Sequence, residues 1–299
     1  MKYKKGLKMN SIIQFKNKLE ISNSKKEIIE VIEELNPNQD LFSSMIIISC
    51  NLLSSVALQA LLETWINRYS KQFNSVRGLG TMYRSLGLNT VLPWLEAGMS
   101  IHSSDSNAPF LRLIIADGNI NHLEKILPYW KTPEIISFKN NQEIIFSSGL
   151  FWAESEAMIN WLVEHGANPN KPSLGDNLNK SELLPLLRSL SYSKEEQLYG
   201  LLKIGADPQQ AHDWVSKTFN SKDFDFLQFS KHTHMVFKYL TEYGYDWNHH
   251  CDSRGSTHFE LLQKSEVPSD IKTLIKVHVE KKKLEEMLNS APVKPKKHL

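Results

Sequence analysis

The chain has 299 residues, 41% hydrophobic and 23% charged, so it can bury a substantial core as one long domain or two ordinary ones. Its 13 glycines and 12 prolines are too few for a low-complexity chain, and a net charge of +2 argues against nucleic-acid binding. The two cysteines, Cys50 and Cys251, lie far apart in sequence, which argues against a disulfide framework and suits a reducing cytoplasm.

The N-terminal segment is expected to be helical. Ser24 and Glu27 have the spacing of a capping box in front of "EIIEVIEEL", and Asn36-Pro37 predicts the end of that helix. The stretch 41–62 carries no charge and is long enough to span a bilayer. Its five serines, with an Asn, a Gln and a Cys, favour a pair of buried helices broken near Cys50. We therefore expect no membrane span.

Glycines recur along the chain at nearly constant spacing. Gly166 precedes Gly205 by 39 residues, Gly205 precedes Gly244 by 39, and Gly98 precedes Gly166 by 68, which is two units of 34. A period of 33 to 39 residues is typical of a stacked helical repeat. Each glycine follows an apolar pair, so each is predicted to end a helix in the left-handed conformation.

These units resemble ankyrin repeats. Gly-Ala-Asn at 166–168 and Gly-Ala-Asp at 205–207 match the closing Gly-Ala-Asp of that repeat. "APFLRLIIADGNINHLEKIL" at 108–127 resembles its paired helices, and "DSRGSTHFELL" at 252–262 resembles its finger and first-helix entry, with His258 in place of the usual proline. Because no unit keeps the full Thr-Pro-Leu-His, a general solenoid of helix pairs stays open as an alternative.

The resemblance implies an all-α, ankyrin-like helical-repeat solenoid with a helical N-terminal cap. The expected organisation is a cap at 1–75 that includes a degenerate repeat at 41–66, ankyrin-like repeats at 76–280, and a basic C-terminal tail at 281–299. Alternating apolar runs typical of strands are hard to find. The nearest candidate, "SFKNNQEIIF" at 137–146, suits a loop that enters a helix at least as well as a strand.

No motif in the sequence indicates catalysis or metal binding. "HHCDSRGSTH" places His249, His250, Cys251 and His258 within ten residues, but adjacent side chains diverge and no Cys-x-x-Cys supports a closed metal site. Gly-x-Ser-x-Gly and His-Glu-x-x-His are both absent from the sequence. We expect no enzyme, no metal and no cofactor. The remaining alternative is an enzyme with a non-motif active site in the N-terminal segment or in the 217–235 insert.

The ankyrin resemblance implies a non-catalytic scaffold that binds or sequesters a protein through its concave face. In a stacked repeat, core positions contact neighbouring units, so a partner meets mainly the fingers after each glycine exit and the inner helix faces. Tryptophans there are natural interface anchors, although each of them could instead pack between repeats. The expected contacts are Lys171, Leu174, Asp176, Gln209, Gln210, Trp214, Trp247, His249 and His250.

The composition, rich in Lys, Asn, Ile and Ser, resembles that of proteins from low-GC bacteria. Ankyrin-like proteins in that setting are typically secreted effectors or immunity and antitoxin proteins that sequester another protein. A Glu-Glu pair at 285–286 weakly resembles the signal of type IV-secreted effectors and favours the effector hypothesis by a small margin. We expect a monomer that acts in the cytoplasm of the producing cell or of a host cell, on a partner the sequence does not identify.

Overall fold

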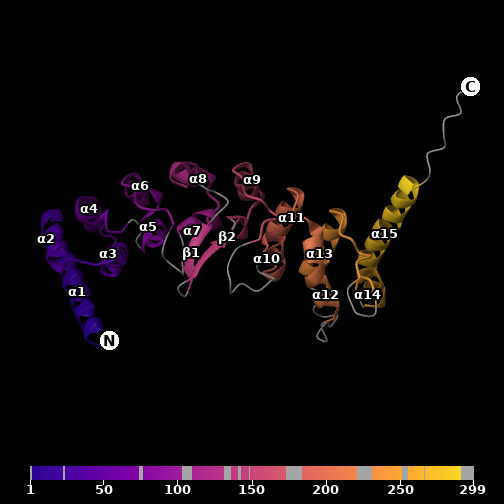
Figure 1. The fold of residues 1–299 in the computed structure, drawn as a ribbon, viewed down its shortest axis with the longest axis horizontal. Coiled ribbons are helices and arrows are strands. Elements are labelled where there is room, and N and C mark those ends of the chain that lie inside the picture. The colour runs from indigo at the N-terminus through magenta and orange to yellow at the C-terminus, as the bar shows by residue number, and fades with distance from the viewer. Residues whose placement is uncertain are drawn as a thin grey trace, which may run out of the picture. The chain divides into compact units, whose positions relative to one another are not determined.

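The structure is a computed structural model that describes residues 2–22, 24–73, 77–102, 110–130, 136–140, 143–147, 149–172, 184–220, 231–250, 255–265 and 267–290. The chain divides into two units. Unit 1 contains Met1–Asn168 and Ser173–Leu178, and unit 2 contains Pro169–Pro172 and Asn179–Leu299. Helices dominate the described part of both units (Figure 1).

Unit 1 is a series of helix pairs. Its elements are α1 (Lys2–Ile21), α2 (Lys25–Leu35), α3 (Gln39–Asn51), α4 (Ser55–Thr64), a π-helical turn η1 (Trp65–Tyr69), α5 (Leu79–Leu86), α6 (Leu88–Glu96), α7 (Phe110–Ala116), α8 (Ile120–Ile126), η2 (Leu127–Tyr129), β1 (Ile136–Asn140), β2 (Glu143–Ser147), η3 (Gly149–Phe151) and α9 (Glu156–Glu164). Helix α3 packs on α4, α5 on α6 and α7 on α8, while α3, α5 and α7 pack in sequence. Helices α1 and α2 pack on this first pair, as the expected N-terminal cap requires.

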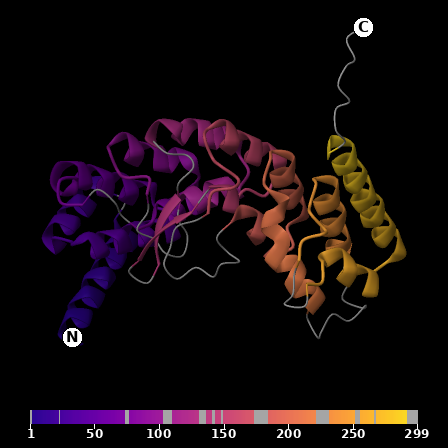
Figure 2. The ribbon, with the colours of Figure 1, turned by 45° about the vertical axis from the view of Figure 1, so that its right-hand side comes forward.

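Unit 2 continues the same plan. Its elements are α10 (Pro185–Ser191), α11 (Glu195–Lys203), η5 (Pro208–Ala211), α12 (His212–Asn220), α13 (Lys231–Glu242), α14 (His258–Lys264) and α15 (Ser269–Ser290). Helices α11, α13 and α15 pack in sequence, and α12 packs on α14 (Figure 2). The expected class, a helical repeat of stacked helix pairs, is therefore confirmed in the described residues. Residues 281–290, assigned above to the basic tail, are the last part of α15.

One short hairpin interrupts the helices, in the segment for which the sequence left a strand and a loop both open. This segment forms antiparallel strands β1 and β2, with Phe138 opposite Ile145. Ile136 and Phe138 alternate with polar residues, and β2 contains two adjacent isoleucines, so both segments suit strands. The alternation is only five residues long, which is too short to stand out in a helical context.

The glycine exits have the geometry predicted for them. Gly98, Gly166, Gly205 and Gly244 have φ between +87° and +98°. In each case the glycine N–H donates to the carbonyl three residues back, and the next N–H donates to the carbonyl five residues back, at 2.9–3.2 Å. This pair of bonds is the Schellman motif, which satisfies the last carbonyls of a helix. The same local chemistry thus ends four helices and turns the chain out of each.

Helix starts are fixed by side-chain caps. Asn38, Ser54 and Ser155 each accept a backbone N–H three residues on, which satisfies one of the free donors at a helix start. Ser24 caps α2 in the same way, but the carboxylate of Glu27 binds the Lys18 ammonium at 2.6 Å and does not complete the expected capping box. A complete box occurs instead at the start of α14, from Thr257 and Glu260.

The uncharged stretch 41–62 forms two buried helices, α3 and α4, as predicted. Cys50 is fully buried near the end of α3, and burial raises the pKa of its thiol to about 12. The thiol is therefore protonated at neutral pH and is not a nucleophile. Within the described residues, none of the helices combines the length and apolar character needed to cross a bilayer.

Replacing an exit glycine by valine should destabilise the protein. A Cβ added at Gly166 or Gly205 meets no atom within 4 Å, so the cost is the left-handed backbone itself. We expect Gly166→Val and Gly205→Val each to lower the free energy of unfolding by about 1 kcal/mol or more. Urea titration measures this loss, and Gly166→Asn is the matched control because asparagine tolerates the left-handed region. Equal stability of the valine and asparagine variants would contradict the assignment.

Candidate protein interface

Three segments of unit 2, each of which follows a glycine exit, form the candidate interface. We name them the first finger (Pro169–Pro172), the second finger (Asp207–Gln210) and the third finger (Asp246–His250). Each finger follows a glycine by two or three residues, so the exit geometry sets its starting direction. Side chains within the fingers then connect each one to the next.

An amide side chain joins the first finger to the second. The Nδ2 of Asn170 donates to the Gly205 carbonyl at 3.0 Å, and its Oδ1 accepts the Asp207 backbone N–H at 2.7 Å. Gln210 of the second finger also donates from Nε2 to the Oδ1 of Asn170 at 2.8 Å. One asparagine thus satisfies a backbone carbonyl and a backbone N–H that helix and turn leave without partners.

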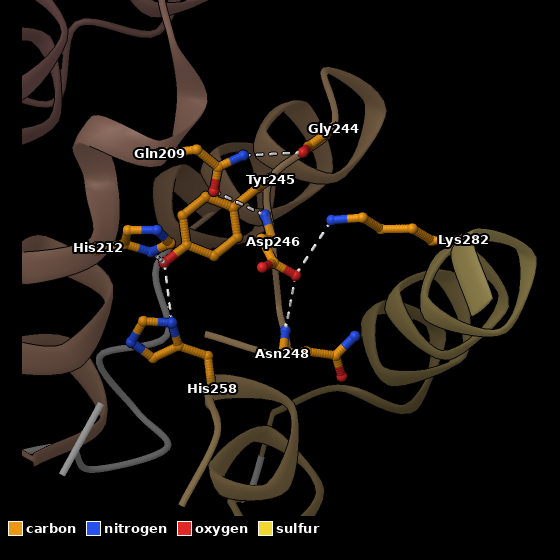
Figure 3. A network of polar contacts seen from close by, with 8 residues as sticks. All are labelled: Gln209, His212, Gly244, Tyr245, Asp246, Asn248, His258 and Lys282. Atoms are coloured by element: carbon orange, nitrogen blue, oxygen red, sulfur yellow. Dashed lines mark hydrogen bonds and ion pairs between the residues drawn. The ribbon is translucent and has the colours of Figure 1, made fainter. Parts of the chain in front are cut away.

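The second finger is joined to the third by the same arrangement. The Nε2 of Gln209 donates to the Gly244 carbonyl at 3.0 Å, and its Oε1 accepts the Asp246 backbone N–H at 2.9 Å (Figure 3). Asn170 and Gln209 both lie four residues after an exit glycine. We call these two side chains the amide clamps. Each clamp fixes the exit of the following repeat against the finger before it.

A group of rings, which we call the imidazole cluster, supports the third finger. It consists of His212, Tyr245, His249 and His258. The Tyr245 hydroxyl lies 2.8 Å from Nδ1 of His212 and 3.0 Å from Nδ1 of His258 (Figure 3). The His212 and His249 rings stack with centroids 3.7 Å apart. The cluster thus connects the start of α12, the third finger and the start of α14.

The expected contact residues lie in different environments. Lys171, His249 and His250 are exposed, while Gln209, Gln210 and Trp214 are half-buried. Gln209 and Gln210 are held by the hydrogen bonds above, and the Nδ1 of His250 lies 2.7 Å from the Gly255 carbonyl. Leu174 and Asp176 lie outside the described residues.

Trp247 belongs to the core of unit 2. Its side chain is 1% exposed, its Nε1 donates to the Thr241 hydroxyl at 3.1 Å, and its ring packs on Tyr245 and Phe237. Trp247 is therefore a packing residue, which was the alternative to a role in partner binding. Trp214 packs edge-on to Phe237 with part of its surface accessible, so it is the tryptophan that can reach a partner.

The histidine-rich segment does not converge on a metal. His249 stacks on His212, His258 is buried, His250 lies against Gly255, and Cys251 lies outside the described residues. In the part of the chain that the structure describes, His, Cys, Asp and Glu side chains form no group of three or more able to hold a metal ion. Independence from metal stays a prediction, to be checked by melting with and without a chelator.

A polar constellation that sequence reasoning missed lies in unit 1. The Tyr83 hydroxyl donates to Oδ2 of Asp117 at 2.6 Å and lies 3.0 Å from Nδ1 of His122, beside an open pocket of about 520 Å³. Burial and then the Asp117 carboxylate raise the pKa of Tyr83 well above its ordinary value. A phenol held protonated in this way is neither a base nor a nucleophile at neutral pH. No motif could have indicated this group, because its members come from α5, α8 and the turn between α7 and α8.

Comparisons with known proteins find similarity among solved structures. No family model matches the chain, and no curated protein matches it. Among solved structures, it is similar to the human ASB11 ankyrin repeat domain, with 15% identity over 78% of this chain and 96% of that chain and a TM-score of 0.44. At this identity and TM-score, the similarity gives no information about a partner.

The amide clamps predict a specific loss of stability. Gln209→Leu removes two hydrogen bonds to backbone groups, so we expect the free energy of unfolding of unit 2 to fall by about 1 kcal/mol. Gln263→Leu on α14 is the matched control, because that glutamine is exposed, and it should cost less than about 0.5 kcal/mol. Urea titration followed by circular dichroism compares the two. A loss of the same size in both variants would show that the clamp contributes nothing specific.

Proposed function

We propose that the protein is a non-catalytic scaffold that binds a protein partner through the fingers and the adjoining helix faces of unit 2. The amide clamps carry this proposal. They fix the finger backbone before binding, so a partner meets an ordered surface and less conformational entropy is lost on association. The proposed contacts in unit 2 are Lys171, Gln210, Trp214, His249 and His250. Leu174 and Asp176 stay predictions from the sequence, since they lie outside the described residues.

The side chains on this surface suit a polar, wet interface with one aromatic anchor. Lys171, His249 and His250 can form rim contacts, and the accessible part of Trp214 can pack into a partner's pocket. Trp247 and Gln209 are left out, because one is in the core and the other is committed to the clamp. The chemistry of Tyr83 and Cys50 described above supports a scaffold over an enzyme.

Within this function we propose a bacterial effector that acts in the cytoplasm of a host cell. The alternative is an immunity protein that neutralises a toxin in the cytoplasm of the producing cell. The two hypotheses name partners from different proteomes. Affinity capture from lysates of the producing bacterium and of a host cell, with purified partner then titrated directly, separates them. Tight binding only to a bacterial toxin would select the immunity hypothesis.

Finger variants should weaken binding without lowering stability. We expect the double variant Lys171→Glu, His250→Glu to weaken affinity for the captured partner at least about tenfold, which is about 1.4 kcal/mol. Lys276→Glu is the matched control, since Lys276 is exposed on α15 and its ion pair with Glu280 is solvated. Isothermal titration calorimetry gives the affinities, and melting temperatures confirm that each variant is folded. Unchanged affinity of the double variant would contradict the proposed surface.

The two tryptophans should behave differently. Trp247→Ala creates a cavity in the core, so we expect it to lower the free energy of unfolding by about 3–5 kcal/mol. Trp214→Ala removes the accessible aromatic anchor and should weaken binding by about 2 kcal/mol. Melting temperature and affinity are measured on both variants. Reduced binding by the folded fraction of Trp247→Ala, with Trp214→Ala binding normally, would reverse the assignment.

A further inference from the structure

The Tyr245 hydroxyl restricts the protonation of the rings on either side of it. The hydroxyl has one proton to donate, and Nδ1 of His212 and Nδ1 of His258 both lie within hydrogen-bond distance. One ring must therefore accept this proton while the other donates an N–H to the phenol oxygen. If both rings are protonated, the oxygen faces two N–H donors and its own proton loses both acceptors.

His258 is the ring least able to carry a charge. It is fully buried, and the hydrogen-bond partners of its ring are two neutral hydroxyls, Tyr245 on Nδ1 and Ser216 on Nε2 at 2.7 Å. The groups that face it are His212, Ser216 and Phe219 from α12, and Tyr245, Asp246 and His249 from the α13–α14 connection. The Asp246 carboxylate is already engaged by Lys282 at 3.3 Å. A proton on His258 would thus be a buried charge without a direct counter-ion.

The titration of both rings follows this geometry. Burial, and then the charges that His212 and His249 would carry, lower the pKa of His258 to about 4, against the opposing effect of Asp246. Burial and then His249 lower the pKa of His212, while the carboxylates of Asp246, Asp207 and Asp213 act in the opposite direction. At neutral pH both rings are therefore neutral.

The third finger depends on the position of His258. The His258 backbone N–H donates to the His249 carbonyl at 3.1 Å, and the Phe259 N–H donates to the Trp247 carbonyl at 2.7 Å. His250 and Thr257 form a β-bridge between the same two segments. The start of α14 and the third finger are therefore joined by backbone bonds as well as by the rings. The pocket of the His258 ring and these backbone bonds thus lie at the same junction.

We infer that the imidazole cluster is an acid-sensitive latch, which holds the third finger against α14 while its rings are neutral and releases it when they gain protons. The inference goes beyond the proposed function and rests on unit 2 alone. It holds whether or not the fingers bind a partner. In an acidifying environment, the latch would open the third finger and expose Trp247.

The direction and size of the pH effect on opening of the latch follow from the pKa of His258. Its pKa in the folded protein, about 4, lies below its ordinary value of 6.5. The stability contributed by the neutral ring is fully present above pH 6.5 and is lost as the pH falls from 6.5 toward 4. Lowering the pH from 7.5 to 5 should therefore raise the equilibrium constant for opening on the order of 30-fold.

The test follows the indole N–H resonance of Trp247 in protein labelled with ¹⁵N-tryptophan. This resonance reports the closed state because the indole donates to Thr241 inside the core. The urea concentration that removes half of its intensity should fall in the wild type as the pH is lowered from 7.5 to 5. In His258→Phe, which fills the pocket with a ring that cannot titrate, the fall should be much smaller. His234→Phe, which removes a less buried histidine of α13, should retain the wild-type fall.

An equal decrease of this urea concentration in the wild type and in His258→Phe would overturn the proposed latch. Should His258→Phe fail to fold, wild-type protein decides by itself, through the histidine Cε1–H resonances. His258 should show no titration between pH 7.5 and 5.5. A His258 midpoint near 6.5, with the finger still closed, would contradict the inference. Because no partner is needed, failure here leaves the binding proposal untouched.

Discussion

The fold depends on how each helix pair ends. A glycine in the left-handed conformation lets the chain leave the second helix while the last carbonyls keep hydrogen-bond partners. That exit exposes a backbone carbonyl and, two residues later, a backbone N–H. In unit 2, Asn170 and Gln209 satisfy both groups of the next exit with one side-chain amide each. The helix ends and the finger positions are thus set by one repeated arrangement.

The third finger is stabilised differently from the other two. Beyond its clamp it is joined to α14 by backbone bonds and by the imidazole cluster, and its Asp246 pairs with Lys282 of α15. Asn248 lies four residues after Gly244, the position of a clamp in the two earlier fingers. Helix α15 continues to Ser290 without a glycine exit, so in the described chain Asn248 has no following exit to bind. On the side of α14, titratable rings and backbone bonds therefore take the place of a further clamp.

The helices, their glycine ends and the buried pair at 41–62 could be predicted, because each depends on residues close in sequence. The sequence left strand and loop both open for the β1–β2 hairpin because its alternation is short. The clamps were missed because Asn170 and Gln209 bind groups 35 to 37 residues away, and no local pattern encodes such partners. The same limit hid Tyr83 with Asp117, and it made Trp247 look like an exposed anchor. The histidines were noticed as a possible metal motif, yet their role depends on Tyr245 and Ser216.

Amide hydrogen exchange tests the central claim most directly, namely that the second finger and the third finger are each held by a separate clamp. The backbone N–H groups of Asp207 and Asp246 are donated to Asn170 and Gln209. Both should be protected in the wild type. Asn170→Ala should remove protection at Asp207 and keep it at Asp246, and Gln209→Ala should do the reverse. The account would be contradicted if both amides exchanged at unprotected rates in the wild type. It would also be contradicted if either single variant removed the protection of both amides.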